Sequence, residues 1–312
     1  MYRASMFYGR KGLPIAVISV IDLAIWDLLG KIRNEPVYKM IGGDTKSGRL
    51  NFYCTGPEPA SAKEMGFFGA KVALPYSPGE GPAGMRKNVA YLRQKRSEVG
   101  PDFPLMVDCY MSLNVQYTVE LAEKTKDLDI NWFEECLSPD DFDGQALIKR
   151  AHPGIKFTTG EHEYSRYGFR KLIEGRNVDI IQPDVMWLGG MTELLKVAAH
   201  AAAYDIPVVC HASGPYSYHF SVSQANSPFQ EYLANSPDGK SVLPVFGNLF
   251  TNEPIPTKGY LDVTELDKPG FGLELNPAAP LIDARQILRP APARSLKDPT
   301  EHKQVDEVPG KK

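Results

Sequence analysis

The sequence has 312 residues, 43% of them hydrophobic and 23% charged, which is typical of soluble globular proteins. Its 35 Lys and Arg and 38 Asp and Glu give a net charge of −3, so no basic excess favours a nucleic acid or an anionic membrane as a partner. The cysteines are widely spaced and form no C-x-x-C pair: Cys54, Cys109, Cys136 and Cys210. This usage favours a reducing, cytoplasmic compartment.

The first predicted element is an amphipathic helix over residues 15–31, with Pro14 near its start. Apolar side chains recur on it at three-to-four spacing and predict a buried stripe: Ile18, Ile21, Ile25, Leu28 and Leu29. Polar residues interrupt the apolar stretch 13–29, so we expect neither a membrane span nor a signal peptide. A second, short helix is predicted over 36–41.

From residue 50 onward, short apolar runs that end in a polar residue alternate with turns and helix-period segments. The eight runs are 51–55, 69–74, 105–108, 130–135, 155–161, 178–184, 206–211 and, weakly, 229–233. The intervening helices are clearest over 84–99, 115–126, 164–174 and 190–204. This alternation predicts a parallel α/β sheet, and eight runs fit a (β/α)8 TIM-type barrel better than an open doubly wound sheet.

Acidic residues end three consecutive predicted strands at spacings of 26 and 27 residues, about one βα unit each: Asp108, Glu134-Glu135 and Glu161. Parallel strands direct their carboxyl ends to one mouth, where these carboxylates would repel one another. A hard divalent cation bound by oxygen relieves that repulsion, and Mg²⁺ is the natural candidate. A strand directs Glu134 and Glu135 to opposite sides, and the residues alone leave open which of them faces the barrel axis.

The next two runs end in Asp184 and His211, which neighbouring strands would place side by side. A carboxylate beside an imidazole raises its basicity, as a general base requires, whereas the plainer interpretation is a structural hydrogen bond. His162 directly follows an acid at a strand end and could contact a substrate. Lys71 is the lysine of the second run, and it either faces the mouth and contacts substrate or lies solvated at an edge.

Seven segments in order resemble the mandelate racemase subgroup of the enolase superfamily and, within it, the L-rhamnonate dehydratases. The resemblance extends from about residue 10 to 280, and the matching segments are 20–31, 107–112, 132–137, 159–162, 182–185, 188–190 and 267–272. It implies a soluble barrel enzyme that acts on a small sugar acid, with no nucleic-acid or membrane partner and with possible homo-oligomers.

The resemblance also implies the roles of the residues. The Mg²⁺ ligands would be Asp108, Glu134 and Glu161, which selects Glu134 over Glu135. The base would be His211 with Asp184, Glu231 would hydrogen-bond the substrate carboxylate, and His162 would line the pocket. Ala73 stands where related racemases carry a second lysine, so we expect elimination of water from a sugar acid, giving a 2-keto-3-deoxy acid.

The expected organisation is a partial helical capping region over 1–49, a barrel over 50–235, a segment over 236–285 that returns to the cap, and a disordered tail over 286–312. Members of the family begin with an α/β cap, and here residue 1 lies almost at the first helix. We therefore expect a shortened cap, a bare apolar surface and a tendency to associate. Two alternatives stay open: a dehydratase for another sugar acid, and a metal-binding barrel without catalysis.

Overall fold

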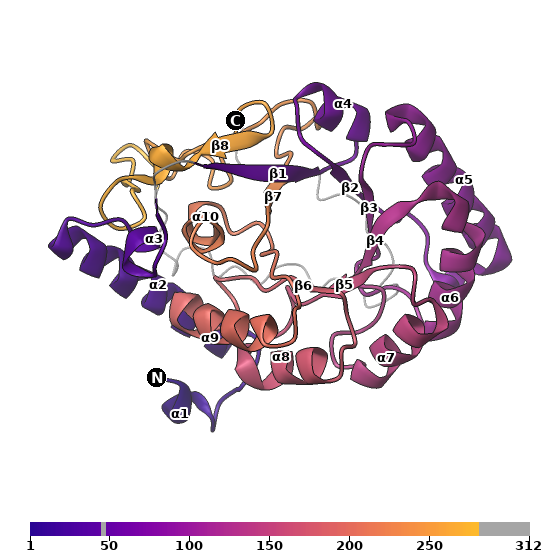
Figure 1. The fold of residues 1–312 in the computed structure, drawn as a ribbon, viewed down its shortest axis with the longest axis horizontal. Helices are drawn as coiled ribbons and strands as arrows, with labels where there is room; N and C mark the ends of the chain where they lie inside the picture. Colours follow the sequence, from indigo (N-terminus) through magenta and orange to yellow (C-terminus); the bar gives the residue numbers. More distant parts are fainter. Residues whose placement is uncertain (45–47, 281–312) are drawn as a thin grey trace. The chain divides into compact units, whose positions relative to one another are not determined.

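The computed structural model describes residues 1–44 and 48–280 of the chain, and residues Met1–Asn276 form one compact unit. Its parallel sheet has the strand order β6-β5-β4-β3-β2-β1-β7 and curls into a ring (Figure 1). The strands are β1 Arg49–Thr55, β2 Ala70–Ala73, β3 Leu105–Asp108, β4 Ile130–Glu134, β5 Phe157–Thr159, β6 Ile180–Ile181 and β7 Gln230–Leu233. Seven of the eight predicted runs are therefore strands, and the predicted barrel is confirmed.

The seventh predicted run, 206–211, is not a strand in the structure, because it forms a bridge to a strand on one side only. It bridges to β6 at Val208, and its next amide, that of Val209, donates to Ile181 O at 3.0 Å. On the side of β7, isolated bonds replace the ladder: Val208 N donates to Asn226 O at 2.8 Å, and the Gln230 amide Nε2 donates to Cys210 O at 2.8 Å. One backbone bond and one side-chain bond thus close the ring at this point.

Helices surround the ring of strands (Figure 1). They are α4 Pro59–Glu64, α5 Gly81–Val99, α6 Val115–Lys124, α7 Phe142–Ala151, α8 Ser165–Glu174, α9 Gly190–Ala202 and α10 Pro215–Ser221. Side-chain caps begin two of them, since the carboxamide of Asn114 accepts from Tyr117 N and the carboxylate of Asp141 accepts from Gly144 N. The apolar faces of α8 and α9 pack on one another and on the sheet, so the main core lies between helices and strands.

Before the barrel come α1 Tyr2–Ser5, α2 Leu13–Arg33 and α3 Val37–Met40. The predicted buried stripe of α2 is wrong: its members are exposed by 37–58%, apart from half-buried Ile18. The buried residues of α2 are instead Ile15, Ser19, Leu23 and Gly30, and the helix packs against α9.

Polar anchors explain which face of α2 is buried. Ser19 Oγ accepts from Gly189 N at 2.8 Å, Asp22 Oδ2 accepts from Thr192 N at 3.0 Å, and Asp27 Oδ1 accepts from Phe271 N at 2.9 Å. These bonds satisfy backbone donors of the barrel and rotate the apolar stripe outward. By length and composition α2 could also cross a membrane, with a mean hydropathy of 1.9, yet its polar residues fasten it to the barrel.

The segment after β7 returns to the start of the chain. Its strand β8, Tyr260–Asp262, pairs antiparallel with the first half of β1, and a short 3-10 helix follows over Val263–Leu266. Gly270 then lies against Gly30, where an added Cβ would come within 2.6 Å of the Gly270 Cα, so only glycine fits at position 30. The predicted tail, 286–312, lies outside the described residues.

Candidate active site at the carboxyl ends of the strands

Lys71 of β2 points into the barrel and lies only 1% exposed. Its Nζ donates to Glu134 Oε1 and lies 2.9 Å from Glu231 Oε1 and 3.5 Å from Asp108 Oδ2. The sequence allowed Lys71 to face the mouth or to lie solvated at an edge, and in the structure it faces the mouth. Burial by itself lowers the pKa of Lys71, but the charges of Glu134 and Glu231 outweigh it and hold this pKa well above its usual value.

Replacing Lys71 with methionine is expected to destabilise the metal-free protein by about 3–5 kcal/mol, because two buried carboxylates lose their counter-charge. Urea unfolding in the presence of a chelator measures the loss. The matched control is Lys124, whose pair with Glu120 lies at the surface, and its methionine variant is expected to change stability by less than about 1 kcal/mol. Equal losses in both variants would contradict a buried charge network.

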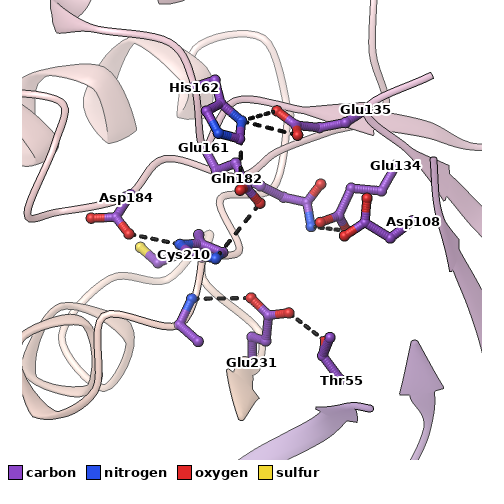
Figure 2. Close-up of polar contacts among 12 residues, drawn as sticks. Thr55, Asp108, Glu134, Glu135, Glu161, His162, Gln182, Asp184, Cys210 and Glu231 are labelled. Carbon is purple, nitrogen blue, oxygen red and sulfur yellow. Dashed lines mark hydrogen bonds and ion pairs between the residues drawn. The ribbon is translucent and has the colours of Figure 1, made fainter. Parts of the chain in front are cut away.

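The three predicted metal ligands lie at the ends of β3, β4 and β5 (Figure 2). Glu134 is held by several donors, since its Oε2 accepts from Trp132 Nε1 at 3.1 Å and from Gln182 Nε2 at 2.6 Å. Asp108 Oδ1 accepts from the amide of Tyr110.

Glu161 is turned toward two imidazoles. Its Oε2 lies 3.7 Å from His211 Nε2, and its Oε1 lies 3.5 Å from His162 Nδ1. The acid that follows β5 is thus in contact with both predicted histidines of the site.

The pKa values of the three acids show how poorly this pocket tolerates their charges. Burial raises the pKa of Asp108 to about 6 and those of Glu134 and Glu161 to about 7, against the opposing charges of Lys71 and His211. Neighbouring carboxylates add to each increase. A set of buried oxygen donors with excess negative charge fits a hard divalent cation such as Mg²⁺.

Glu135, which the residues alone left open as the alternative to Glu134, also lies at this end of the sheet. Its φ of +45° breaks the strand geometry, so Glu134 faces the interior while Glu135 turns to His162, whose Nδ1 lies 2.8 Å from Oε1. That hydrogen bond raises the pKa of His162, against burial. Among the described residues, one group of three potential ligand atoms lies within 4.8 Å of one another, and it consists of Glu135, Glu161 and His162 rather than the predicted trio.

His211 and Asp184 lie side by side, as neighbouring strands predict. His211 Nδ1 donates to Asp184 Oδ2 at 2.6 Å, which leaves Nε2 directed toward Glu161. Burial by itself lowers the pKa of His211, but the bond to Asp184 and the charges of Glu161 and Glu231 raise it to about 10. The pair has the orientation that a general base needs.

Glu231 of β7 is buried beside Lys71 in the floor of the site. Thr55 Oγ1 donates to its Oε1, and Ala212 N donates to its Oε2 at 3.0 Å (Figure 2). Burial raises the pKa of Glu231, but Lys71 and His211 outweigh it, so the pKa stays below its usual value and the group is ionised.

Sequence reasoning missed several side chains that complete the site: Thr55, Trp132, Gln182 and Trp187. Trp187 follows β6, and its ring centroid lies 5.5 Å from that of His162 and 5.4 Å from that of His211. A neutral side chain in a strand or a turn carries no spacing signal, so only proximity in the fold reveals such residues.

The fold and this constellation define a class: a β/α barrel with a histidine–carboxylate pair beside a cluster of buried acids, at the carboxyl ends of the strands, where the active sites of such barrels lie. The chain belongs to the enolase C-terminal domain-like family, whose model matches residues 59–279. The resemblance to the enolase superfamily is thereby confirmed.

Individual proteins within this family are similar to the chain over most of its length. An L-rhamnonate dehydratase of Saccharopolyspora erythraea is 48% identical over 282 residues, which is 90% of this chain and 72% of that protein. The crystal structure of rhamnonate dehydratase from Gibberella zeae complexed with Mg is 78% identical with a TM-score of 0.88, over 89% of this chain and 68% of that one. The 3,6-anhydro-D-galactonate cycloisomerase of Zobellia galactanivorans is 31% identical with a TM-score of 0.76, over 88% and 77% of the two chains.

Proposed function

We propose that this protein is a Mg²⁺-dependent dehydratase that converts L-rhamnonate into 2-keto-3-deoxy-L-rhamnonate and water. The observation that carries the proposal is the His211–Asp184 pair, whose Nε2 faces the acidic mouth 3.7 Å from Glu161 Oε2. The relatives at 48% and 78% identity support the substrate.

In the proposed reaction, His211 Nε2 takes the proton from C2 while Asp184 holds the ring by Nδ1. The electron pair of that C–H bond passes into the C1 carboxylate and gives an enediolate. It then returns to form the C2–C3 double bond as the C3–O bond breaks, and the leaving hydroxyl takes up the proton that His211 has gained and departs as water. The resulting enol tautomerises to the keto acid. Lys71 would pair with the substrate carboxylate from the floor of the site, and Glu231, 2.9 Å from Lys71 Nζ, would hold that ammonium group in place.

Asp108, Glu134 and Glu161 would hold the Mg²⁺, as their buried oxygens allow. A bound Mg²⁺ supplies Lewis-acid stabilisation of the developing enediolate. The charge of Glu161 contributes to the high pKa of His211. A cation held by Glu161 would neutralise the charge of this carboxylate and lower the pKa of His211. The imidazole would then be neutral and available as a base.

A panel of sugar acids with Mg²⁺ tests the proposal, with formation of a 2-keto acid as the readout. L-Rhamnonate is expected to give the highest kcat/KM among acids that differ from it in configuration at C3, C4 or C5. A higher value for another acid would identify a different dehydratase. No turnover of any acid, together with Mg²⁺ binding, would favour a metal-binding barrel without catalysis.

We further propose that the chain associates with a second copy through the outward face of α2. Large apolar side chains lie exposed along its whole length: Leu13, Val17, Val20, Ile21, Ile25, Leu28 and Ile32. Contiguous apolar surface of this length favours association in water. Exchanging Ile21 and Leu28 for lysine is expected to shift the sedimentation coefficient to that of a monomer. A wild-type chain that sediments as a monomer at micromolar concentration would contradict the proposal.

A further inference from the structure

Trp187 is an aromatic residue at the mouth of the site that the reaction itself does not use. Its backbone amide donates to Asp184 O at 3.0 Å, and so does that of fully buried Leu188, at 2.9 Å. Asp184 therefore both orients His211 and closes the turn that carries Trp187. Trp187 is half-buried, and its ring lies within 5.5 Å, centroid to centroid, of the imidazoles of His162 and His211.

The burial of the surrounding groups determines where the far end of a substrate can lie. The floor is closed, since Lys71, Glu134 and Glu231 are each 1% exposed. The rim is more open, since the side chain of His162 is 32% exposed and Trp187 is half-buried. A sugar acid whose C1 and C2 are held near the floor must direct its remaining carbons toward this rim.

We propose that Trp187 receives the C6 methyl group of the substrate and makes the site selective for 6-deoxy sugar acids, an inference that rests on the proposed function. Burying a methyl group against the apolar face of an indole removes apolar surface from water, which favours binding. The same surface cannot replace the water that a C6 hydroxyl would lose there. The ring thus distinguishes L-rhamnonate from L-mannonate, which has the same configuration and differs only in carrying a hydroxyl at C6.

The test compares kcat/KM for these two acids in the wild type and in variants. An apolar pocket discriminates against an added hydroxyl by up to about 10²-fold, so we expect the wild type to prefer L-rhamnonate by about 10-fold or more. In Trp187→Ala this preference is expected to fall to about 3-fold or less, whereas Trp187→Phe keeps most of it. Both acids share C1 to C5, so a general loss of folding or of base function lowers both rates and leaves their ratio unchanged.

The matched control is Tyr110→Ala, which removes another aromatic side chain, 43% exposed, that follows β3 instead of β6. We expect the ratio to stay at its wild-type value in that variant. An unchanged ratio in Trp187→Ala, or an equal loss in Tyr110→Ala, would overturn the assignment.

A binding measurement separates this inference from the proposed function. Titration calorimetry of both acids with Mg²⁺ into the His211→Asn protein reports affinity without turnover. Tighter binding of L-rhamnonate, lost on adding Trp187→Ala, supports the assignment even if the wild type dehydrates neither acid and the proposed reaction fails. Equal affinity for the two acids overturns the assignment while leaving dehydration intact. Absence of binding by either acid overturns both.

Discussion

Replacing His211 with asparagine is expected to lower kcat for the dehydration of L-rhamnonate by about 10³-fold or more, within the range that a general base contributes. The asparagine amide can still bond to Asp184, but it cannot accept the C2 proton where Nε2 now lies. Initial rates of 2-keto acid formation at saturating Mg²⁺ measure the loss, and exchange of the C2 proton with deuterated solvent is expected to stop in the same variant.

Two further measurements separate a base from a structural histidine. The Mg²⁺-induced rise in melting temperature is expected to persist in His211→Asn, because this residue is no proposed ligand. Asp184→Asn keeps the imidazole and loses its orienting partner, so we expect a smaller reduction in rate, about 10- to 100-fold. Loss of the Mg²⁺ response in His211→Asn would instead place the imidazole among the metal ligands.

Removing a single proposed ligand is expected to abolish the stabilisation by Mg²⁺ and, with it, the activity. A ligand that binds only the folded chain stabilises it by about 2.7 kcal/mol at one hundred times its Kd. For a chain of this size that corresponds to a rise of several degrees in Tm. Asp108→Asn and Glu161→Gln should each lose the rise, as followed by differential scanning calorimetry with and without Mg²⁺.

Glu135→Gln is the informative control, because Glu135 belongs to the compact group with Glu161 and His162 but not to the predicted trio. If the trio holds the ion, Glu135→Gln keeps the Mg²⁺ response that Asp108→Asn loses. The reverse pattern would place the metal at the rim of the barrel instead of its floor.

The pH dependence of the Mg²⁺ response follows from the same acids. Their pKa values are raised to about 6 for Asp108 and about 7 for Glu134 and Glu161, so the metal-free folded chain keeps protons that Mg²⁺ must displace. The stabilisation by Mg²⁺ should thus be small near pH 5.5, grow as pH rises through 7 and level off above 8. A response that is independent of pH would indicate ligands with ordinary pKa values.

The barrel and most of its chemical groups could be predicted from the sequence because their signals are local. Each βα unit can be recognised in the sequence from a short apolar run followed by a segment with helical periodicity. Parallel neighbours then bring the ends of successive runs together without further information. For this reason Asp184 and His211, 27 residues apart, could be expected in contact, and they lie 2.6 Å apart.

Tertiary structure alone decided the features for which two placements are locally equivalent. Both sides of α2 carry apolar residues, and the bonds of Ser19 and Asp22 to the turn and helix that follow β6 determine which side is buried. Only the positive φ of Glu135 turns a second carboxylate toward His162. Trp187 belongs to no periodic pattern in the sequence, and the turn after β6 brings it beside His162 and His211. Packing and hydrogen bonding across the fold choose among such placements, because the local free energies of the alternatives are nearly equal.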